Sequence, residues 1–219
     1  MENSVSLIAL MSFATLMPFV IASGTCFIKF SIVFVMVRNA LGLQQIPSNL
    51  TLNGIALMLS AFVMMPIAQQ SYGWYKEAGV EFNSVQAVVQ FADEGLGSYR
   101  AYLQKYADPE LTQFFQKLEA QRQEADEPGV IADEKPSLVS LLPAYALSEI
   151  KSAFKIGFYI YLPFVVVDLV ISSILLSLGM MMMSPVTISV PVKLILFVAM
   201  DGWSLLAKGL VQQYLDLPR

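Results

Sequence analysis

Charged side chains inside apolar sequence are the residues of this chain with the clearest capacity for chemistry. Lys29, Asp168, Lys193 and Asp201 lie within apolar stretches, and Arg38 follows one directly. A charge at the centre of a membrane span costs about 2.5–3.5 kcal/mol on insertion scales, so it should pair with another group or line water. Two roles fit: ion pairs that join helices or subunits, and a path for protons or ions. We favour the pairs, because no series of acidic residues runs along one helix.

The same residues do not form a recognisable enzyme site. An intramembrane aspartyl protease needs two carboxylates that share a proton at close range. Asp168 and Asp201 lie in neither the Tyr-Asp nor the Gly-x-Gly-Asp context of such proteases. The chain has no histidine, no Ser–Lys motif and no glycine-rich phosphate loop. We therefore predict a protein that is not an enzyme and has no metal site and no cofactor, with its single cysteine, Cys26, as a small buried side chain.

Four consecutive methionines, Met180, Met181, Met182 and Met183, follow Gly179 and precede Ser184-Pro185. Methionine is unbranched and deformable, so it packs around irregular shapes. A stripe that faces a core would repeat every three or four residues, whereas consecutive residues point in all directions. Ordinary core filling and a soft seal around a pore both remain open on spacing alone, and the consecutive run favours the seal.

The composition is that of a membrane protein. Hydrophobic residues make up 56% and charged residues 14%, and the mean hydropathy is +0.62. Soluble domains have about 45–50% apolar and about 25% charged residues. The net charge of −4 argues against a nucleic-acid partner.

The charges predict three consecutive parts. Residues 71–136 hold 6 basic and 12 acidic side chains, so they form an acidic polar insert. The expected parts are a hydrophobic helical hairpin over 1–70, a mostly helical insert over 71–136, and a second hydrophobic hairpin over 137–219 that carries the methionine run. Arg38 lies in a short loop, and basic loops mark the cytoplasmic side, so we expect the insert on the other side.

Four apolar segments define the expected fold, an all-α membrane protein of two hairpins. Pro18 and Gly24 interrupt the first segment, which predicts a broken helix ending at a Gly42 cap. The four segments cover residues 5–37, 52–68, 156–178 and 188–210.

Local signals predict helices within the insert. Asp108-Pro109 has the acidic cap and first-turn proline of a helix start. Asn83 and Gln86 have capping-box spacing. The acidic sequence over 124–129 is expected to be a loop.

Three blocks of the sequence carry a family resemblance. They read KFSIVFVMVRNALGLQQIPSN over 29–49, PAYALSEIKSAFKIGF over 143–158 and LPFVVVDLVISSILLSLGMMMMSP over 162–185. In this order they resemble the SctR/FliP family of inner-membrane export-apparatus subunits, which serve bacterial type III secretion systems and the flagellar exporter. The start Met1-Glu2-Asn3 has no basic signal-peptide region, which favours the injectisome branch of that family.

The resemblance implies an assembly as well as a fold. Members of the family form a homopentameric ring with SctS-type and SctT-type subunits and contact inner rod or needle-base proteins. The ring is an export gate for unfolded secreted polypeptides, set in membrane lipid and raised toward the periplasm. In the family a methionine-rich loop forms a gasket around the closed channel, and the matching positions are Met180 to Met183.

Two other functions remain open from the residues alone. A proton-coupled carrier would titrate Asp168 or Asp201 during transport and would act as a monomer or dimer. A membrane anchor would have its binding function in residues 71–136.

Overall fold

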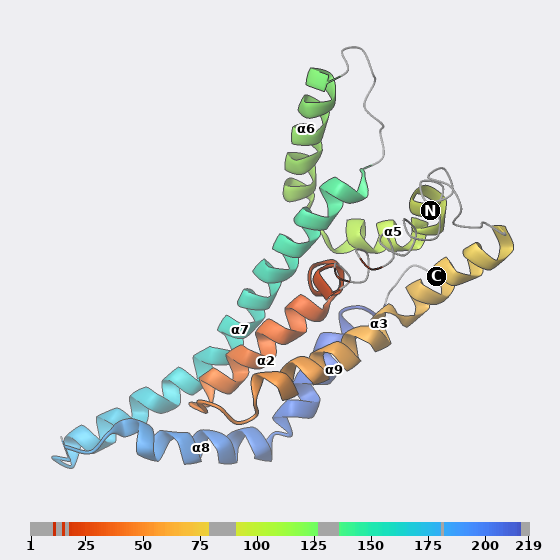
Figure 1. Cartoon of the computed structure of the whole chain (residues 1–219). Coiled ribbons are helices and arrows are strands. Elements are labelled where there is room, and N and C mark those ends of the chain that lie inside the picture. The colour runs from red at the N-terminus through yellow and green to blue at the C-terminus, as the bar shows by residue number, and fades with distance from the viewer. Residues whose placement is uncertain are drawn as a thin grey trace. The chain divides into compact units, whose positions relative to one another are not determined.

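The structure is a computed structural model that describes residues 18–78, 91–126, 136–180 and 182–215, together with Met11 and Thr15. Every regular element in these ranges is a helix (Figure 1). After a first helix, Pro18–Gly24, the elements are α2 (Phe27–Ala40), α3 (Asn49–Ala78), a π-helical turn η1 (Phe91–Gly95), α5 (Gly97–Tyr106), α6 (Pro109–Asp126), α7 (Leu138–Ser177), α8 (Pro185–Ala199) and α9 (Gly202–Gln212).

Two of these helices, α3 and α7, are long and apolar enough to cross a membrane. Two bent helix pairs satisfy the same test when each is taken as one span: Pro18–Gly24 with α2, and α8 with α9. The predicted all-α membrane fold is therefore confirmed. The predicted break in the first segment is also found, at Thr25–Cys26, directly after Gly24.

The lengths of two helices differ from expectation. The second segment was predicted to end near Ala68, but α3 continues through Pro66 to Ala78. A proline inside a helix removes one backbone hydrogen bond, and a long helix tolerates that loss when the residues on both sides remain helical. Similarly, α7 is one helix of 40 residues, where a separate span was expected from residue 156.

The fourth segment is divided, where one continuous helix over 188–210 was expected. α8 ends at Ala199, α9 begins at Gly202, and the two helices are bent by 59°. Asp201 between them has a left-handed backbone with φ of 51°. Aspartate is one of the few residues other than glycine that tolerates this conformation, so Asp201-Gly202 breaks the helix although its flanks are apolar.

The chain forms two compact units, while the division into three consecutive parts stays a prediction. The first unit contains 1–28, 64–149 and 217–219, and the second contains 29–63 and 150–216. Helices α3 and α7 contribute residues to both. Each unit is described separately.

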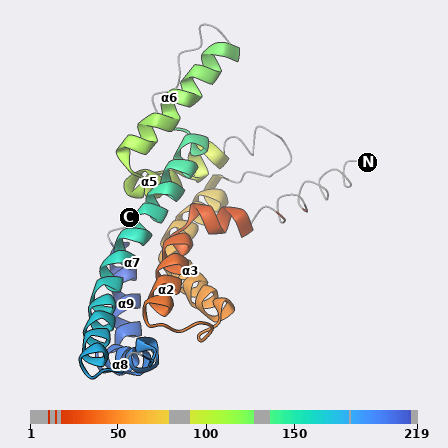
Figure 2. The same ribbon diagram turned by 90° about the vertical axis from the view of Figure 1, so that its left-hand side faces the viewer.

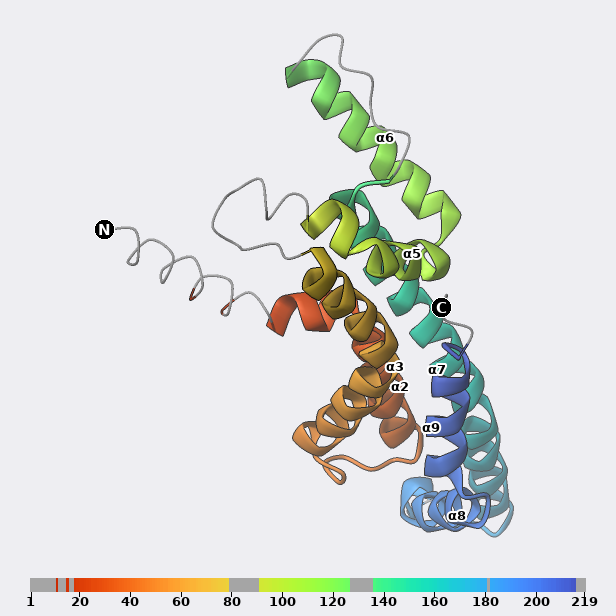
Figure 3. The ribbon, with the colours of Figure 1, turned by 90° about the vertical axis from the view of Figure 1, so that its right-hand side faces the viewer.

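Helix α2 supplies the buried centre of the second unit, where it forms a hairpin with the first part of α3 (Figures 1 and 3). Phe30 packs edge-on against Tyr214, and Phe34 packs edge-on against Trp203. Gly157 of α7 lies so close to Met36 that a Cβ there would collide with the methionine side chain. Aromatic edges and a close glycine contact thus fix how α7 and α9 pack on α2.

The first unit contains α5, α6 and the start of α7 (Figure 2). The predicted start of α6 is confirmed, since the Asp108 carboxylate accepts a hydrogen bond from the Glu110 amide at 3.0 Å. Ser148 Oγ accepts from the Asp108 amide, and Ser137 donates to Glu119, so α6 and the start of α7 run antiparallel.

Two further predictions within the insert have different outcomes. The predicted capping box of Asn83 and Gln86 lies outside the described residues. The acidic loop was placed too early, because α6 continues to Asp126; residues 127–129 lie outside the described ranges.

Candidate functional site

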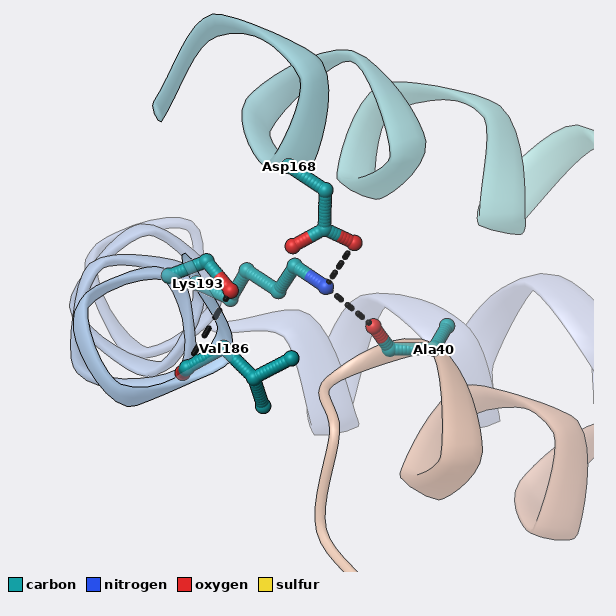
Figure 4. Close-up of polar contacts among 5 residues, drawn as sticks. Ala40, Asp168, Val186 and Lys193 are labelled. Carbon is teal, nitrogen blue, oxygen red and sulfur yellow. Dashed lines mark hydrogen bonds and ion pairs between the residues drawn. The ribbon is translucent and has the colours of Figure 1, made fainter. Parts of the chain in front are cut away.

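Lys193 of α8 joins three helices of the second unit (Figure 4). Its ammonium group lies 2.5 Å from Asp168 Oδ2 on α7 and donates to the carbonyl oxygen of Ala40 at 3.2 Å. Ala40 is the last residue of α2, so its carbonyl has no acceptor role inside that helix. The Lys193 ammonium group thus neutralises the Asp168 carboxylate and also donates a hydrogen bond to the free carbonyl at the end of α2.

Local sequence explains why Lys193 lies at this position. Ser184 and Pro185 begin α8, with proline in the first turn where no amide hydrogen is needed. One turn later Ser189 donates to the Val186 carbonyl at 3.5 Å, and Lys193 follows one further turn along the helix. Their face of α8 is the buried one, because Ser189, Lys193 and Phe197 are all buried.

The two members of the ion pair differ in exposure. The Lys193 side chain is 6% exposed, whereas that of Asp168 is 42% exposed. An amine buried to this extent requires a counter-charge and hydrogen-bond acceptors. The negative pole of the α2 dipole at Ala40 adds to the attraction. The geometry therefore suits a fixed structural contact, in which the aspartate retains one side open to its surroundings.

Neutral groups are among the partners of Lys29 and Arg38. Lys29 Nζ lies 3.5 Å from Gln213 Oε1 and 4.7 Å from the centre of the Tyr214 ring. Arg38 Nη1 donates to the Pro47 carbonyl at 3.0 Å and to Asn49 Oδ1 at 2.7 Å. Both cations are buried; Lys29 connects α2 with the segment after α9, and Arg38 connects α2 with the following loop and the start of α3.

Asp201 has a backbone role rather than a position in this cluster. It is exposed and precedes α9 without a side-chain capping bond. Of the five charges singled out from sequence, the structure thus brings Asp168 and Lys193 together as a direct ion pair and places Asp201 at the helix break.

Met180, Met182 and Met183 lie in the turn between α7 and α8. Gly179, with φ of +71°, ends α7: its amide bonds to the Leu176 carbonyl, and the Met180 amide bonds to that of Leu175. This is the Schellman pattern, in which a left-handed glycine allows two end carbonyls to be satisfied. Met180, Met182 and Met183 are 39%, 103% and 43% exposed, and Met181 lies outside the described residues.

A buried polar cluster in the first unit is not among the residues predicted from the sequence. Tyr102 and Tyr145 are fully buried and share a hydrogen bond between their hydroxyls. Glu149 is 1% exposed. Burial raises the pKa of Tyr102, with a smaller contribution from the nearby thiol of Cys26. A signal was present, since Glu149 is the one carboxylate in the otherwise apolar and basic sequence over 143–158.

Known proteins resemble this chain over nearly its whole length. The FliP family matches residues 10–210. The surface presentation of antigens protein SpaP of Salmonella typhimurium is 64% identical over 222 residues, which cover 99% of each chain. The Yop proteins translocation protein R of Yersinia pestis is 44% identical over 217 residues, or 98% of each chain. The harpin secretion protein HrcR of Erwinia amylovora is 36% identical over 203 residues, or 92% of each chain.

Proposed function

The chain belongs to the FliP family, and from that membership we propose that it is a subunit of the type III export apparatus in a bacterial inner membrane. The observation that carries this function is the full-length similarity to proteins named for secretion and translocation. Long apolar helices provide independent support for a position in the membrane.

The subunit builds a ring-shaped gate for unfolded secreted polypeptides. It forms a homopentamer with SctS-type and SctT-type subunits, contacts inner rod or needle-base proteins, and projects toward the periplasm. Large apolar side chains exposed on α3 and α7 leave these helices free to contact lipid or neighbouring subunits. Examples on these two helices are Met58, Phe62, Phe154, Val166 and Leu169.

The methionine turn, Met180 to Met183, is the gasket of this gate. Its support is the exposure of the three described methionines at a turn that is closed on one side by Gly179 and on the other by Pro185. Fixed helix ends hold the turn in place, while unbranched side chains re-pack around a passing chain. A ring of such turns seals the resting channel against small ions.

The five charged residues hold the assembly together in this proposal. The contact of Lys193 with Asp168 supports a clamp within the chain, whereas the exposed side of Asp168 and the exposed Asp201 are available to neighbouring subunits. We do not propose the proton carrier, because Asp168 is engaged in a direct contact with Lys193 and Asp201 lies at the break between α8 and α9.

Replacement of all four methionines by alanine tests the gasket. We expect ion leak across the inner membrane of cells that hold the assembled apparatus, measured as loss of membrane potential. Met58→Ala with Met65→Ala is the matched control, since it removes two exposed methionines from α3 and leaves the turn intact. A wild-type level of leak in a normally assembled complex would exclude the gasket.

A separate measurement tests the export role. Removal of the chain from its host should abolish the appearance of secreted substrates in the medium while their synthesis continues. Normal secretion without the chain would contradict the export role. An ion leak in the methionine-to-alanine variant would then need an explanation other than an export gate.

A further inference from the structure

A cavity of about 360 Å³ opens in the second unit between α2, α3 and α9. Its lining residues are almost all apolar: Phe34, Pro47, Leu52, Ile55, Trp203, Ser204 and Ala207. Ser204 supplies the one polar side chain of this set. The volume falls within the range of about 300–1,000 Å³ that is typical of ligand pockets in proteins.

The cavity has a closed floor and an open mouth. Phe34 and Leu52 at the floor are 2% and 1% exposed, whereas Ile55 and Trp203 are 42% and 37% exposed. The Trp203 ring lies edge-on to Phe34 and to Phe197, with ring centres 6.2 Å and 5.3 Å apart. Because aromatic contacts on two sides fix the indole, the pocket exists before any ligand enters.

A buried cation, Arg38, contacts one residue of the pocket lining. Arg38 follows Phe34 by one turn on α2 and is 7% exposed. Its Nη1 donates a hydrogen bond to the carbonyl of Pro47, which lines the pocket. Its Nε is buried without a hydrogen-bond partner in the described part of the chain. Both acceptors of Nη1 are neutral oxygens. Among the residues that the structure describes, its partners are these neutral oxygens, and no anion there offsets the lost hydration of the guanidinium.

A helix pole lies at the same edge of the pocket. Arg38 Nη1 also bonds to the side chain of Asn49, the first residue of α3. Ser48 caps this end by accepting the Thr51 amide at 3.2 Å. The N-terminal pole of a long helix favours anions, so its field adds to that of the guanidinium.

We propose that this pocket binds an anionic phospholipid, with the phosphate at Arg38 and the first turn of α3 and one acyl chain between Trp203 and Ile55. A phospholipid supplies both the anion and the apolar chain that the site lacks. Ile46 and Leu50 beside the site are 78% and 85% exposed, which suits contact with hydrocarbon. The binding requires a position in a membrane and does not depend on the export role.

Quenching of tryptophan fluorescence by brominated lipid measures this occupancy. The chain has two tryptophans, so Trp74→Phe leaves Trp203 as the only reporter. The full chain, alone and with its partner subunits, is placed in nanodiscs that contain phosphatidylglycerol or phosphatidylcholine with brominated acyl chains. We expect half-maximal quenching of Trp203 at about fivefold less phosphatidylglycerol than phosphatidylcholine, the preference that one cation at the surface typically provides.

Two variants separate the headgroup from the acyl chain. Arg38→Gln should abolish the preference for phosphatidylglycerol, whereas Lys208→Gln, which removes an exposed cation from α9, should preserve it. Ala207→Leu fills the pocket without touching Arg38 and should reduce quenching by both lipids. Gly209→Ala is its control, since a Cβ there meets open space.

Three results would overturn the proposal: equal quenching by the two lipids, full quenching in the Ala207→Leu protein, or protection of Trp203 in the assembled complex, which would indicate a sister subunit in the pocket. If Arg38→Gln fails to fold, the comparison of the two lipids in the wild-type pocket and in Ala207→Leu still decides. None of these outcomes bears on secretion.

Discussion

Lys193 donates a hydrogen bond to the backbone carbonyl of Ala40, a residue 153 positions earlier in the chain, at 3.2 Å. The same ammonium group contacts Asp168, so one side chain connects the end of α2 with α7 and α8. The two partners of the Lys193 ammonium group differ. One is the Asp168 carboxylate, which is partly exposed. The other is the Ala40 carbonyl at the end of α2, which accepts no hydrogen bond within that helix.

Asp168→Asn should therefore destabilise the protein more than Lys193→Met. The asparagine leaves the buried amine of Lys193 without a counter-charge, and we expect a cost of about 2–3 kcal/mol, below the 3–5 kcal/mol of fully buried pairs because Asp168 itself is partly exposed. Lys193→Met should cost about 1 kcal/mol, because it removes one hydrogen bond to Ala40 and leaves a carboxylate that is partly exposed. Unfolding in detergent with graded denaturant measures both, with the exposed Lys208→Met as control. Equal losses for the two variants would show that the missing counter-charge of the buried amine adds nothing.

Gly42 and Gly179 form a matched pair of helix ends. Both have a positive φ, +79° and +71°, but a Cβ at Gly42 would meet Val190 at 2.6 Å, whereas one at Gly179 meets nothing within 4 Å. Gly179→Ala should cost about 1–2 kcal/mol from backbone strain alone. Gly42→Ala should cost about 1–3 kcal/mol more from overpacking. Addition of Val190→Ala should recover only that second part, as measured by the same unfolding assay; full recovery would mean that strain is negligible.

Replacement of Met180 to Met183 by leucine should separate the sealing of the channel from the flexibility of the methionine side chains. Leucine retains an apolar side chain of similar volume but has fewer rotatable bonds than methionine. We expect the membrane to remain tight and secretion to become slower, in contrast to the leak expected for alanine. The measurement pairs membrane potential with the rate of substrate release. Wild-type secretion by the leucine variant would show that flexible side chains are not required.

Tyr99 should make the stability of the first unit depend on pH above 10. Burial raises the pKa of Tyr99 to about 12, from an ordinary value of 10.0. The folded form therefore retains the phenol proton where the unfolded form has lost it, so this contribution is complete below pH 10 and is lost as pH rises through about 12. The free energy of unfolding should fall over this window, and less steeply in Tyr99→Phe.

The absorbance of the phenolate form, followed against pH, provides the control for this prediction, because it reports the loss of the tyrosine proton directly. Tyr99 also donates to the Gly24 carbonyl at 2.8 Å, so Tyr99→Phe lowers stability at every pH as well as changing the slope. An unchanged slope in that variant would assign the pH effect to other groups.

Local signals in the sequence predicted the fold where one or two residues decide the backbone. Gly24, Gly42 and the pair Asp108-Pro109 each specify a break, a cap or a start, and all three predictions are confirmed. The resemblance to the SctR/FliP family is confirmed by the match over residues 10–210. The break at Asp201 was missed, because hydropathy is high on both sides and a single left-handed aspartate does not interrupt it.

Contacts between distant segments had no signal in a single sequence. Every residue has a backbone carbonyl, so nothing in the sequence marks Ala40 as the acceptor for Lys193. Spacing along the chain likewise could not assign Asp168 to one of three buried cations, because the answer depends on how α2, α7 and α8 pack. The clamp is a product of tertiary structure, whereas the caps are products of local sequence.

Burial of Cys26 has a practical consequence for the study of the methionine turn. Cys26 is the only cysteine of the chain, and its side chain is 0% exposed. The natural protein should therefore react little with thiol-directed labels, because thiols react as exposed thiolates. A single Met182→Cys substitution at a fully exposed position would report crosslinks between neighbouring turns without prior removal of the native thiol.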